Sequence, residues 1–286
     1  MVPREADDSQ DEVPDDAEDP GFTEGVTIDP VDLEDDDDGE EEEEGGAGDE
    51  EEEEDVEVVL HADRPVPSLD ELRAALAWAF EKEETPDGFL DACARHARLV
   101  QEANRRMNVT KIVEPREIAA KHYLDCWQTT RLLPLLGRSV LDIGTGAGYP
   151  GIPIALAEEH ARVHLMDSIK KKADFVAESI AELEIRNASA EWGRAEEHLL
   201  RNRYDVCIMR AISSVRENVR LLRKVRHSLY DLVMMKGSSW SREVRAGERE
   251  AERLGFRLDT ILEFELPGEM GGRAVLVYRA PGGQGR

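Results

Sequence analysis

The stretch VLDIGTGAGYPGIPIA, residues 140–155, constrains this chain more than any other part of its sequence. It runs from an apolar strand into three glycines, and then into two prolines at the place where a helix should begin. A glycine-rich turn between a strand and a helix commonly holds a nucleotide-like cofactor. The stretch therefore predicts an α/β fold with a cofactor site, and the chemistry of that cofactor decides the function.

Short apolar runs alternate with helical stretches over residues 138–281. The predicted strands are SVLDI, RVHLMD, ASAEWG, YDVCIMR and YDLVMMKG, and the helical stretches between them include a long one over VRENVRLLRKVRHSL. Two closing strands, FRLDTILEFEL and RAVLVYRA, are joined by PGEMGG without a helix, which predicts an antiparallel hairpin. We expect a mostly parallel, Rossmann-like sheet covered on both faces, with this hairpin at its C-terminal end.

Residues 65–137 show helical patterns and no strand pattern. PSLDELRAALAWAF begins with Ser68 and has Glu71 three residues later, which is a capping-box signature. Two further helical stretches are GFLDACARHARLVQEANRRMN and PREIAAKHYLDCWQTTRLLPLL. We expect a small helical N-terminal region over residues 65–137, followed by the cofactor-binding domain over residues 138–281.

The net acidity of the chain belongs to its first 60 residues. They hold 30 Asp and Glu against one basic residue, Arg4, whereas the other 226 residues sum to a charge of +1. A block of like charges with little apolar material cannot offset the entropy cost of becoming ordered. We therefore expect residues 1–64 to form a disordered acidic tail. It either solubilises the protein or competes with RNA for the protein's own basic face.

Several classes of protein are not indicated by the sequence. The start, MVPREADDSQ, lacks the basic and apolar segments of a signal peptide, and no stretch reaches the roughly 18 apolar residues of a membrane span. Cys93, Cys126 and Cys207 lie far apart, without the spacing of a disulfide framework or a zinc site. We expect a cytoplasmic protein with no bound metal and no membrane association.

Two registers of the glycine loop are possible. Gly146, Gly148 and Gly151 match the dinucleotide pattern G-x-G-x-x-G. Gly144, Gly146 and Gly148 match the D-x-G-x-G-x-G pattern of class I S-adenosylmethionine (SAM) methyltransferases, with Asp142 at the strand end. Neither match is decisive alone, because glycine also serves ordinary tight turns.

Further observations favour SAM. Pro150 and Pro153 remove backbone N–H donors from the helix start, where a pyrophosphate would need them. Asp142 would repel a pyrophosphate but suits the sulfonium and ammonium groups of SAM. The dinucleotide register also begins two residues late, and the closing hairpin fits a methyltransferase sheet. Asp167, at the end of HLMD, can accept hydrogen bonds from ribose hydroxyls. GRAEE follows the next strand, where adenine would lie, although a surface helix start explains it equally well.

Several separated blocks resemble the RsmG/GidB family of bacterial 16S rRNA methyltransferases over residues 90–280. These blocks are NVTKIVEPREIAAKHYLDC, LDIGTGAGYPGIPIA and LMDSIKKKADF, followed in the family's order by GRAEE, MRAISSV and MMKG. The prolines after the glycines are part of the family signature. The resemblance implies a SAM-dependent enzyme that methylates N7 of a guanine in 16S rRNA, free or in the 30S subunit or its precursor. We expect the enzyme to be a monomer.

The resemblance also implies roles for individual residues. Those expected to bind SAM are Gly144, Gly146, Gly148 and Tyr149 at its methionine end, Asp167 at the ribose, Ala195 and Glu196 at the adenine, and Arg210. Those expected to act in catalysis are Asp125, which would stabilise developing positive charge, Arg210 and Asn108. His122 and Lys236 are also expected to contact the RNA substrate. Apart from the resemblance, Arg105, Arg106 and Lys111 are expected to contact it because basic side chains bind RNA phosphates.

The chain departs from the family pattern at a few positions. Ala103 stands where the family usually has Trp, which puts local packing or an RNA contact in doubt, and Cys126 stands where it has Ser. Two other functions remain open at this point. The later glycine register would fit an NAD(P)-dependent oxidoreductase, and a SAM fold without activity would fit a ribosome-assembly factor.

Overall fold

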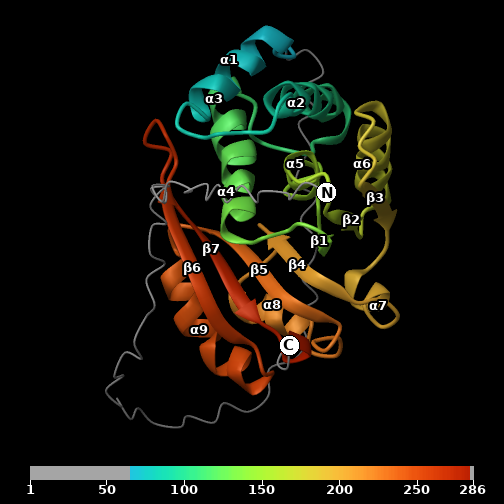
Figure 1. Cartoon of the computed structure of the whole chain (residues 1–286), viewed down its shortest axis with the longest axis vertical. Helices are drawn as coiled ribbons and strands as arrows, with labels where there is room; N and C mark the ends of the chain where they lie inside the picture. The colour runs from blue at the N-terminus through green and yellow to red at the C-terminus, as the bar shows by residue number, and fades with distance from the viewer. Residues whose placement is uncertain (1–64, 284–286) are drawn as a thin grey trace, which may run out of the picture. The chain divides into compact units, whose positions relative to one another are not determined.

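The computed structural model describes residues 65–283, so the acidic region expected to be disordered, residues 1–64, lies outside the described part. Within residues 65–283, seven strands form one sheet in the order β3-β2-β1-β4-β5-β7-β6 (Figure 1). Their bounds are β1 (Ser139–Ile143), β2 (Arg162–Asp167), β3 (Ala188–Trp192), β4 (Tyr204–Arg210), β5 (Leu229–Gly237), β6 (Arg257–Glu265) and β7 (Gly272–Arg279).

The sheet has the predicted mixture of directions. Strands β1 to β5 pair in parallel, and β7 lies antiparallel between β5 and β6. The expected α/β class with a closing antiparallel hairpin is therefore confirmed. The strand order reverses between β1 and β4, and in such sheets ligands bind outside the carboxyl ends of the strands at this point.

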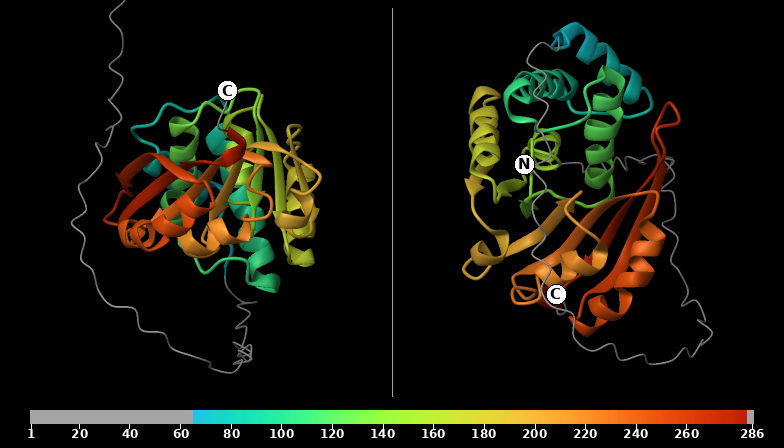
Figure 2. Two further views of the ribbon diagram at one scale, coloured as in Figure 1. Left: turned by 90° about the horizontal axis from the view of Figure 1, so that it is seen from below. Right: turned by 180° about the vertical axis from the view of Figure 1, so that it is seen from behind.

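Helices cover both faces of the sheet (Figures 1 and 2). α5 (Gly151–Ala157) and α6 (Lys170–Glu182) share one buried apolar cluster with Val140 and Val163. α7 (Ala195–His198), α8 (Val215–Leu221) and α9 (Trp240–Arg253) share the other with Leu141. Successive residues of a strand thus point into different cores, as the period of two in a strand requires.

The helices before β1 pack onto the α5 side of the sheet. They are α1 (Leu69–Ala79), α2 (Phe89–Met107), α3 (Pro115–Ile118), the π-helical segment η1 (Ala119–Leu124) and α4 (Asp125–Leu132). The predicted capping box is present, because Ser68 and Glu71 exchange hydrogen bonds between side chain and backbone. Leu76 and Val100 belong to the same apolar cluster as Val140, so these helices are built onto the sheet's own core.

Two helix predictions need correction. The stretch VRENVRLLRKVRHSL does not form one long helix, since α8 ends at Leu221 and turns follow up to residue 228. Those turns bury Leu222 and Val225 and bring the chain directly into β5. The third predicted helix is continuous but contains the wider turns of η1, a form frequently found at functional sites. None of the helices within residues 65–283 is long and apolar enough to cross a membrane.

Candidate functional site

The glycine loop between β1 and α5 is closed by Asp142. Its Oδ2 accepts hydrogen bonds from the Thr145 hydroxyl at 2.6 Å and from the Gly151 N–H at 2.8 Å. The side chain is fully buried, and this burial raises the pKa of Asp142 to about 7. Oδ1 has no hydrogen-bond partner among the described residues. Asp142 therefore ties the loop and the start of α5 together, and its second oxygen is buried without a hydrogen-bond partner among the described residues.

Backbone donors of the loop are already used within the protein. Gly146 donates its N–H to Asp167 Oδ2 at 2.9 Å, and Gly148 donates to the Thr145 carbonyl at 3.0 Å. The N–H of Gly151 is taken by the carboxylate before the loop. A pyrophosphate needs such groups free. The loop is therefore a poor phosphate cradle, as the prolines predicted.

Asp167 lies beside the residues expected to hold adenine. Its carboxylate is buried and accepts from the N–H of Gly146 and from a backbone N–H two residues further on. Its carbonyl accepts the Gly193 N–H at 3.1 Å, which brings the start of α7 alongside. Ala195 is buried there and Glu196 is half-buried. The structure thus brings Asp167, Ala195 and Glu196 to one side of the loop.

Three large apolar side chains are exposed at the same edge of the sheet. Ile169 follows β2, Trp192 ends β3 and Ile212 follows β4, with exposed fractions of 42%, 57% and 39%. Ile212 lies against Gly144, because a Cβ added to that glycine would be 3.0 Å from the Ile212 side chain. These residues were not predicted from the sequence. The only available signal was an apolar residue at or just after the end of a strand.

Arg210, at the end of β4, joins the sheet to η1 and α4. Its guanidinium donates to the Lys121 carbonyl at 2.6 Å and to His122 Nδ1 at 3.1 Å. Its Nε lies 3.4 Å from Asp125 Oδ2, and its guanidinium carbon lies 5.7 Å from the centre of the Tyr149 ring. The structure therefore gathers three predicted site residues, His122, Asp125 and Tyr149, around the guanidinium of a fourth, Arg210.

His122 is an internal link of this cluster. Because a guanidinium only donates, His122 Nδ1 must accept, and Nε2 carries the proton toward the Thr110 hydroxyl at 3.1 Å. Burial, and secondly Arg210, hold the pKa of His122 well below its usual value. The ring stacks on Tyr149 with centroids 4.3 Å apart. The structure thus places His122, expected at the RNA, as a buried neutral group inside the wall of the site.

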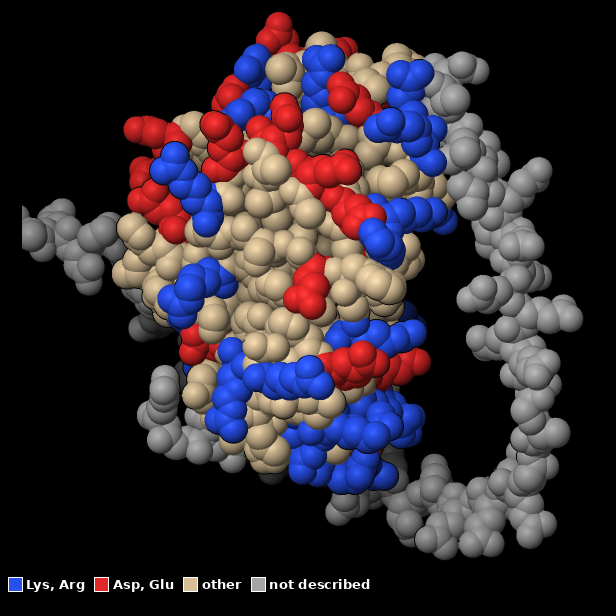
Figure 3. Space-filling view, turned by 90° about the vertical axis from the view of Figure 1, so that its right-hand side faces the viewer, with Lys and Arg blue, Asp and Glu red and all other residues tan. Residues whose placement is uncertain are grey.

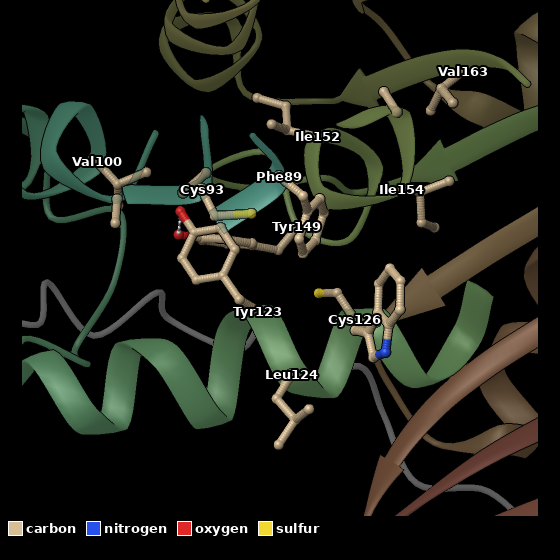
Figure 4. Close-up of a cluster of buried hydrophobic side chains, with 14 of the residues drawn as sticks. Phe89, Cys93, Val100, Tyr123, Leu124, Cys126, Tyr149, Ile152, Ile154 and Val163 are labelled. Carbon is tan, nitrogen blue, oxygen red and sulfur yellow. Dashed lines mark hydrogen bonds between the residues drawn. The ribbon is translucent and has the colours of Figure 1, made fainter. Parts of the chain in front are cut away.

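A second buried histidine supports the glycine loop from α2. His96 Nε2 donates to the Ala147 carbonyl at 3.1 Å, so its Nδ1 accepts the Tyr123 hydroxyl at 2.9 Å. Tyr123 in turn accepts the hydroxyl of Tyr149 at 3.0 Å, and Figure 4 shows the two hydroxyls pointing toward each other. Burial lowers the pKa of His96 to about 3. His96 and Tyr123 were not predicted, since each sits in a helical pattern without a local motif.

The residues expected to bind RNA separate into two groups. Arg105, Arg106 and Lys111 are exposed around the end of α2. Asn108, which was expected to act in catalysis, is exposed between them at the C-cap of that helix. Lys236 differs, because its side chain is only 8% exposed. It donates to a backbone carbonyl and pairs with a carboxylate of α9 at 2.8 Å. The first group forms an accessible basic surface, whereas Lys236 sits inside an ion pair.

Two departures from the family pattern face the interior. Ala103 is 3% exposed and belongs to the core cluster of α2, so the missing Trp changes packing there and not an exposed surface. Cys126 is fully buried beneath Arg210, with its Sγ 3.6 Å from Nη1. Cys126 therefore contributes to the environment of the guanidinium.

Known proteins similar to this chain include rRNA methyltransferases. Residues 90–269 match the family model GidB, described as rRNA small subunit methyltransferase G. Ribosomal RNA small subunit methyltransferase G of Solibacter usitatus is 33% identical over 193 residues, covering 68% of this chain and 91% of that protein. Its counterpart in Clostridium botulinum (strain ATCC 19397 / Type A) is 34% identical over 181 residues, covering 60% and 74%. The solved structure of a SAM dependent methyltransferase from Aquifex aeolicus gives a TM-score of 0.45 at 16% identity, over 60% of this chain and 97% of that chain.

Proposed function

This chain belongs to the GidB family, rRNA small subunit methyltransferase G, and we propose that it transfers a methyl group from SAM to N7 of a guanine in 16S rRNA. The family makes it a SAM-dependent rRNA methyltransferase and disfavours the oxidoreductase reading. The observation that carries the proposal is the glycine loop, in which the N–H donors of Gly146, Gly148 and Gly151 are used by the protein. A cofactor without phosphate suits such a loop.

The residues around the loop fit SAM. Gly146 has a left-handed backbone (φ 61°), and a Cβ added there would meet nothing within 4 Å, which leaves space above the loop. Asp167 would accept hydrogen bonds from the ribose hydroxyls, since each of its oxygens has a second lone pair. Ala195 and Glu196 would meet the adenine. The unpartnered oxygen of Asp142 would suit a cationic group of the cofactor.

The reaction needs orientation more than proton transfer. SAM, when bound, supplies a methyl group activated by the adjoining sulfonium. Guanine N7 has an in-plane lone pair and no proton, so N7 bonds to the methyl carbon as the carbon–sulfur bond breaks and its electrons stay on sulfur. No general base is required. Holding the two reactants in line can supply up to about 7–11 kcal/mol of the barrier.

The Arg210 cluster would do this positioning. Methylation at N7 leaves a cationic guanine, which Asp125 would stabilise, but Asp125 lies 3.4 Å from Arg210 and shares its charge with that guanidinium. Asn108 would line the pocket from the end of α2. The exposed Arg105, Arg106 and Lys111 would contact rRNA phosphates, which provide most of the affinity in such complexes. A cytoplasmic monomer acting on the 30S subunit or its precursor fits these roles.

SAM binding is best tested with a matched pair of glycine variants. Gly146→Ala and Gly137→Ala each place a Cβ on a left-handed backbone (φ 61° and 72°) in open space, but only Gly146 lies in the loop. Both should lose about 1–2 kcal/mol of stability. Only Gly146→Ala should raise the Kd for SAM in calorimetry, by at least about 10-fold, or 1.4 kcal/mol. Equal Kd values for the two variants would contradict the assigned pocket.

The methylated atom is tested on ribosomal subunits. The full-length protein is incubated with SAM and with 30S subunits that lack the modification, and 16S rRNA is then cleaved with borohydride and aniline. We expect one new cleavage site, because that treatment cuts at N7-methylguanine. Methyl incorporation without cleavage would leave an rRNA methyltransferase that acts on another atom.

A further inference from the structure

Three side chains that lie away from the glycine loop and its cofactor site converge on one point. They are His164 in β2, Glu191 in β3 and His198 at the end of α7. One ligand atom from each lies within 4.8 Å of the other two, and no other group of three His, Cys, Asp or Glu does so within residues 65–283. Glu191 Oε2 lies 3.2 Å from His164 Nε2 and 3.6 Å from His198 Nδ1.

The sheet and α7 create this convergence. The parallel register of β2 and β3 sets Ser189 opposite His164, and Glu191 is two residues further on the same face of β3. α7 then returns over this face, so that the His198 ring stacks on His164 with centroids 4.9 Å apart. Three residues from three different elements therefore present their polar atoms to one small volume.

The outer nitrogens of both rings are held by hydroxyl groups. His164 Nδ1 lies 2.8 Å from the Ser189 hydroxyl, and His198 Nε2 lies 2.9 Å from the Tyr204 hydroxyl. Hydroxyl oxygens can accept the N–H of a neutral imidazole, which then keeps its lone pair on the inner nitrogen. This is the arrangement found around metal-bound histidines, where a second group orients each ring.

We propose that His164, Glu191 and His198 bind a divalent first-row metal ion, with Zn²⁺ the best match. Ligand atoms about 2.0–2.1 Å from a tetrahedral ion lie roughly 3.3–3.4 Å apart, close to the two N···O distances of this cluster. Two imidazoles and one carboxylate are a known ligand set of zinc with an open fourth position, whereas Mg²⁺ prefers oxygen ligands. The ion would tie α7 to β2 and to the edge strand β3.

The site is accessible to an ion from solvent. His164, Ser189 and Tyr204 line a shallow cleft of about 410 Å³, and the Glu191 side chain is 54% exposed. Arg162, Arg186 and Arg203 line the same cleft and would favour an anion as the fourth ligand. Figure 3 views the molecule from the side of α6, β3 and α7, and its lower part shows acidic side chains among basic ones.

The test uses the full-length protein after removal of metal by a chelator. Co²⁺ is titrated in the presence of excess Mg²⁺, which occupies the carboxylates of residues 1–60. We expect one equivalent of Co²⁺ to give the intense visible absorption of a tetrahedral site, displaced by one equivalent of Zn²⁺. X-ray absorption at the zinc edge should show two imidazole ligands. Weak absorption from Co²⁺ bound only by oxygens would overturn the proposal.

Variants locate the site. Glu191→Gln and His198→Gln should each weaken Zn²⁺ binding by at least about 100-fold, and Ser189→Ala, which removes only an orienting hydroxyl, by about 10-fold. The matched control is His160→Ala, since His160 pairs with Glu159 at 3.4 Å on the surface without a second imidazole. It should bind like the unchanged protein. Circular dichroism of the metal-free variants checks that they are folded. An unchanged affinity for Zn²⁺ in folded Glu191→Gln and His198→Gln variants would refute the site.

Discussion

Two pairs of histidines in this protein have opposite surroundings. His96 and His122 are buried in the wall of the cofactor site, and protein groups use both nitrogens of each ring. His164 and His198 are partly exposed, and each has one nitrogen on a hydroxyl group and the other beside the same exposed carboxylate, that of Glu191. The interior pair is suited to hold backbone and rings in place, whereas the outer pair is suited to bind an added ligand.

The comparison has an energetic consequence. Removing an interior ring leaves buried partners without hydrogen bonds, and each such group costs about 1–3 kcal/mol. Removing a group from an exposed ion pair costs about 0–1 kcal/mol. The two pairs should therefore separate clearly in stability measurements on the metal-free protein.

The largest effect is expected for Arg210→Met, which removes the cation beside His122. Asp125 would then be a buried carboxylate without its partner, and breaking a buried ion pair costs about 3–5 kcal/mol. We expect this loss in the free energy of unfolding, measured with urea at pH 7. The double variant Asp125→Asn/Arg210→Met should recover part of it. A double variant as unstable as both single losses added would show that the pair is not coupled.

The next effect concerns the other interior ring. His96→Leu leaves the Tyr123 hydroxyl and the Ala147 carbonyl without their present partner, so the free energy of unfolding should fall by about 1–3 kcal/mol. The Kd for SAM should rise as well, because Ala147 belongs to the glycine loop. Replacing the exposed His227 by Leu is the matched control and should change both quantities little. An unaltered Kd for SAM in a folded His96→Leu variant would show that the glycine loop keeps its conformation without the hydrogen bond from His96.

The cost of His96→Leu should also depend on pH. The pKa of His96 is about 3 in the folded protein and near 6.5 when the chain is unfolded, so below pH 6.5 only the unfolded ring takes up a proton. Stability from this ring is full above pH 6.5 and is lost as the pH falls toward 3. The difference between the two proteins should therefore shrink by about 1.4 kcal/mol per pH unit below 6.5.

Comparing the free energies of unfolding of the unchanged protein and His96→Leu removes the pH dependence of other groups, which would otherwise oppose that of His96. The pKa of Asp142 is raised to about 7, so the folded protein gains a proton there first and becomes more stable as the pH falls from 7 toward 3.8. That contribution is present in both proteins and cancels. Urea unfolding at half-unit steps from pH 7 to 4.5 measures the difference, and a constant gap would contradict a neutral His96.

Local patterns explain what could be predicted from the sequence. The strands alternate or run apolar between turns, and the loop carries its glycines, prolines and Asp142 within the twelve residues 142–153, so these parts were predicted correctly. The end of α8 at Leu221 was not, because helical spacing continues past it and only burial of Leu222 and Val225 against the sheet ends the helix. The wide turns of η1 likewise have no pattern of their own.

The parts of the site that were missed depend on contacts between distant residues. His96 and Ala147 are 51 residues apart, and His164 and Glu191 are 27 apart across a strand register that no local motif specifies. The family resemblance implied that Lys236 contacts the RNA substrate, but its ion pair with Glu243 of α9 appears only once the helix is packed. The chemical character of a single residue can be predicted from its neighbours in the sequence. Which distant residue it will contact in the folded protein cannot.

The smallest effect is expected for Glu191→Gln in the metal-free protein, and it decides whether the two histidine pairs truly differ. The Glu191 side chain is 54% exposed, so its contacts with His164 and His198 are surface interactions and their loss should change the free energy of unfolding by less than about 0.5 kcal/mol. Zn²⁺ at 100 times its Kd should stabilise the unchanged protein by about 2.7 kcal/mol, and the variant, which binds at least about 100-fold more weakly, by no more than about 0.4 kcal/mol. Thermal unfolding with and without the ion measures both. If Glu191→Gln instead costs as much as His96→Leu without metal, the outer pair is a structural link like the interior one.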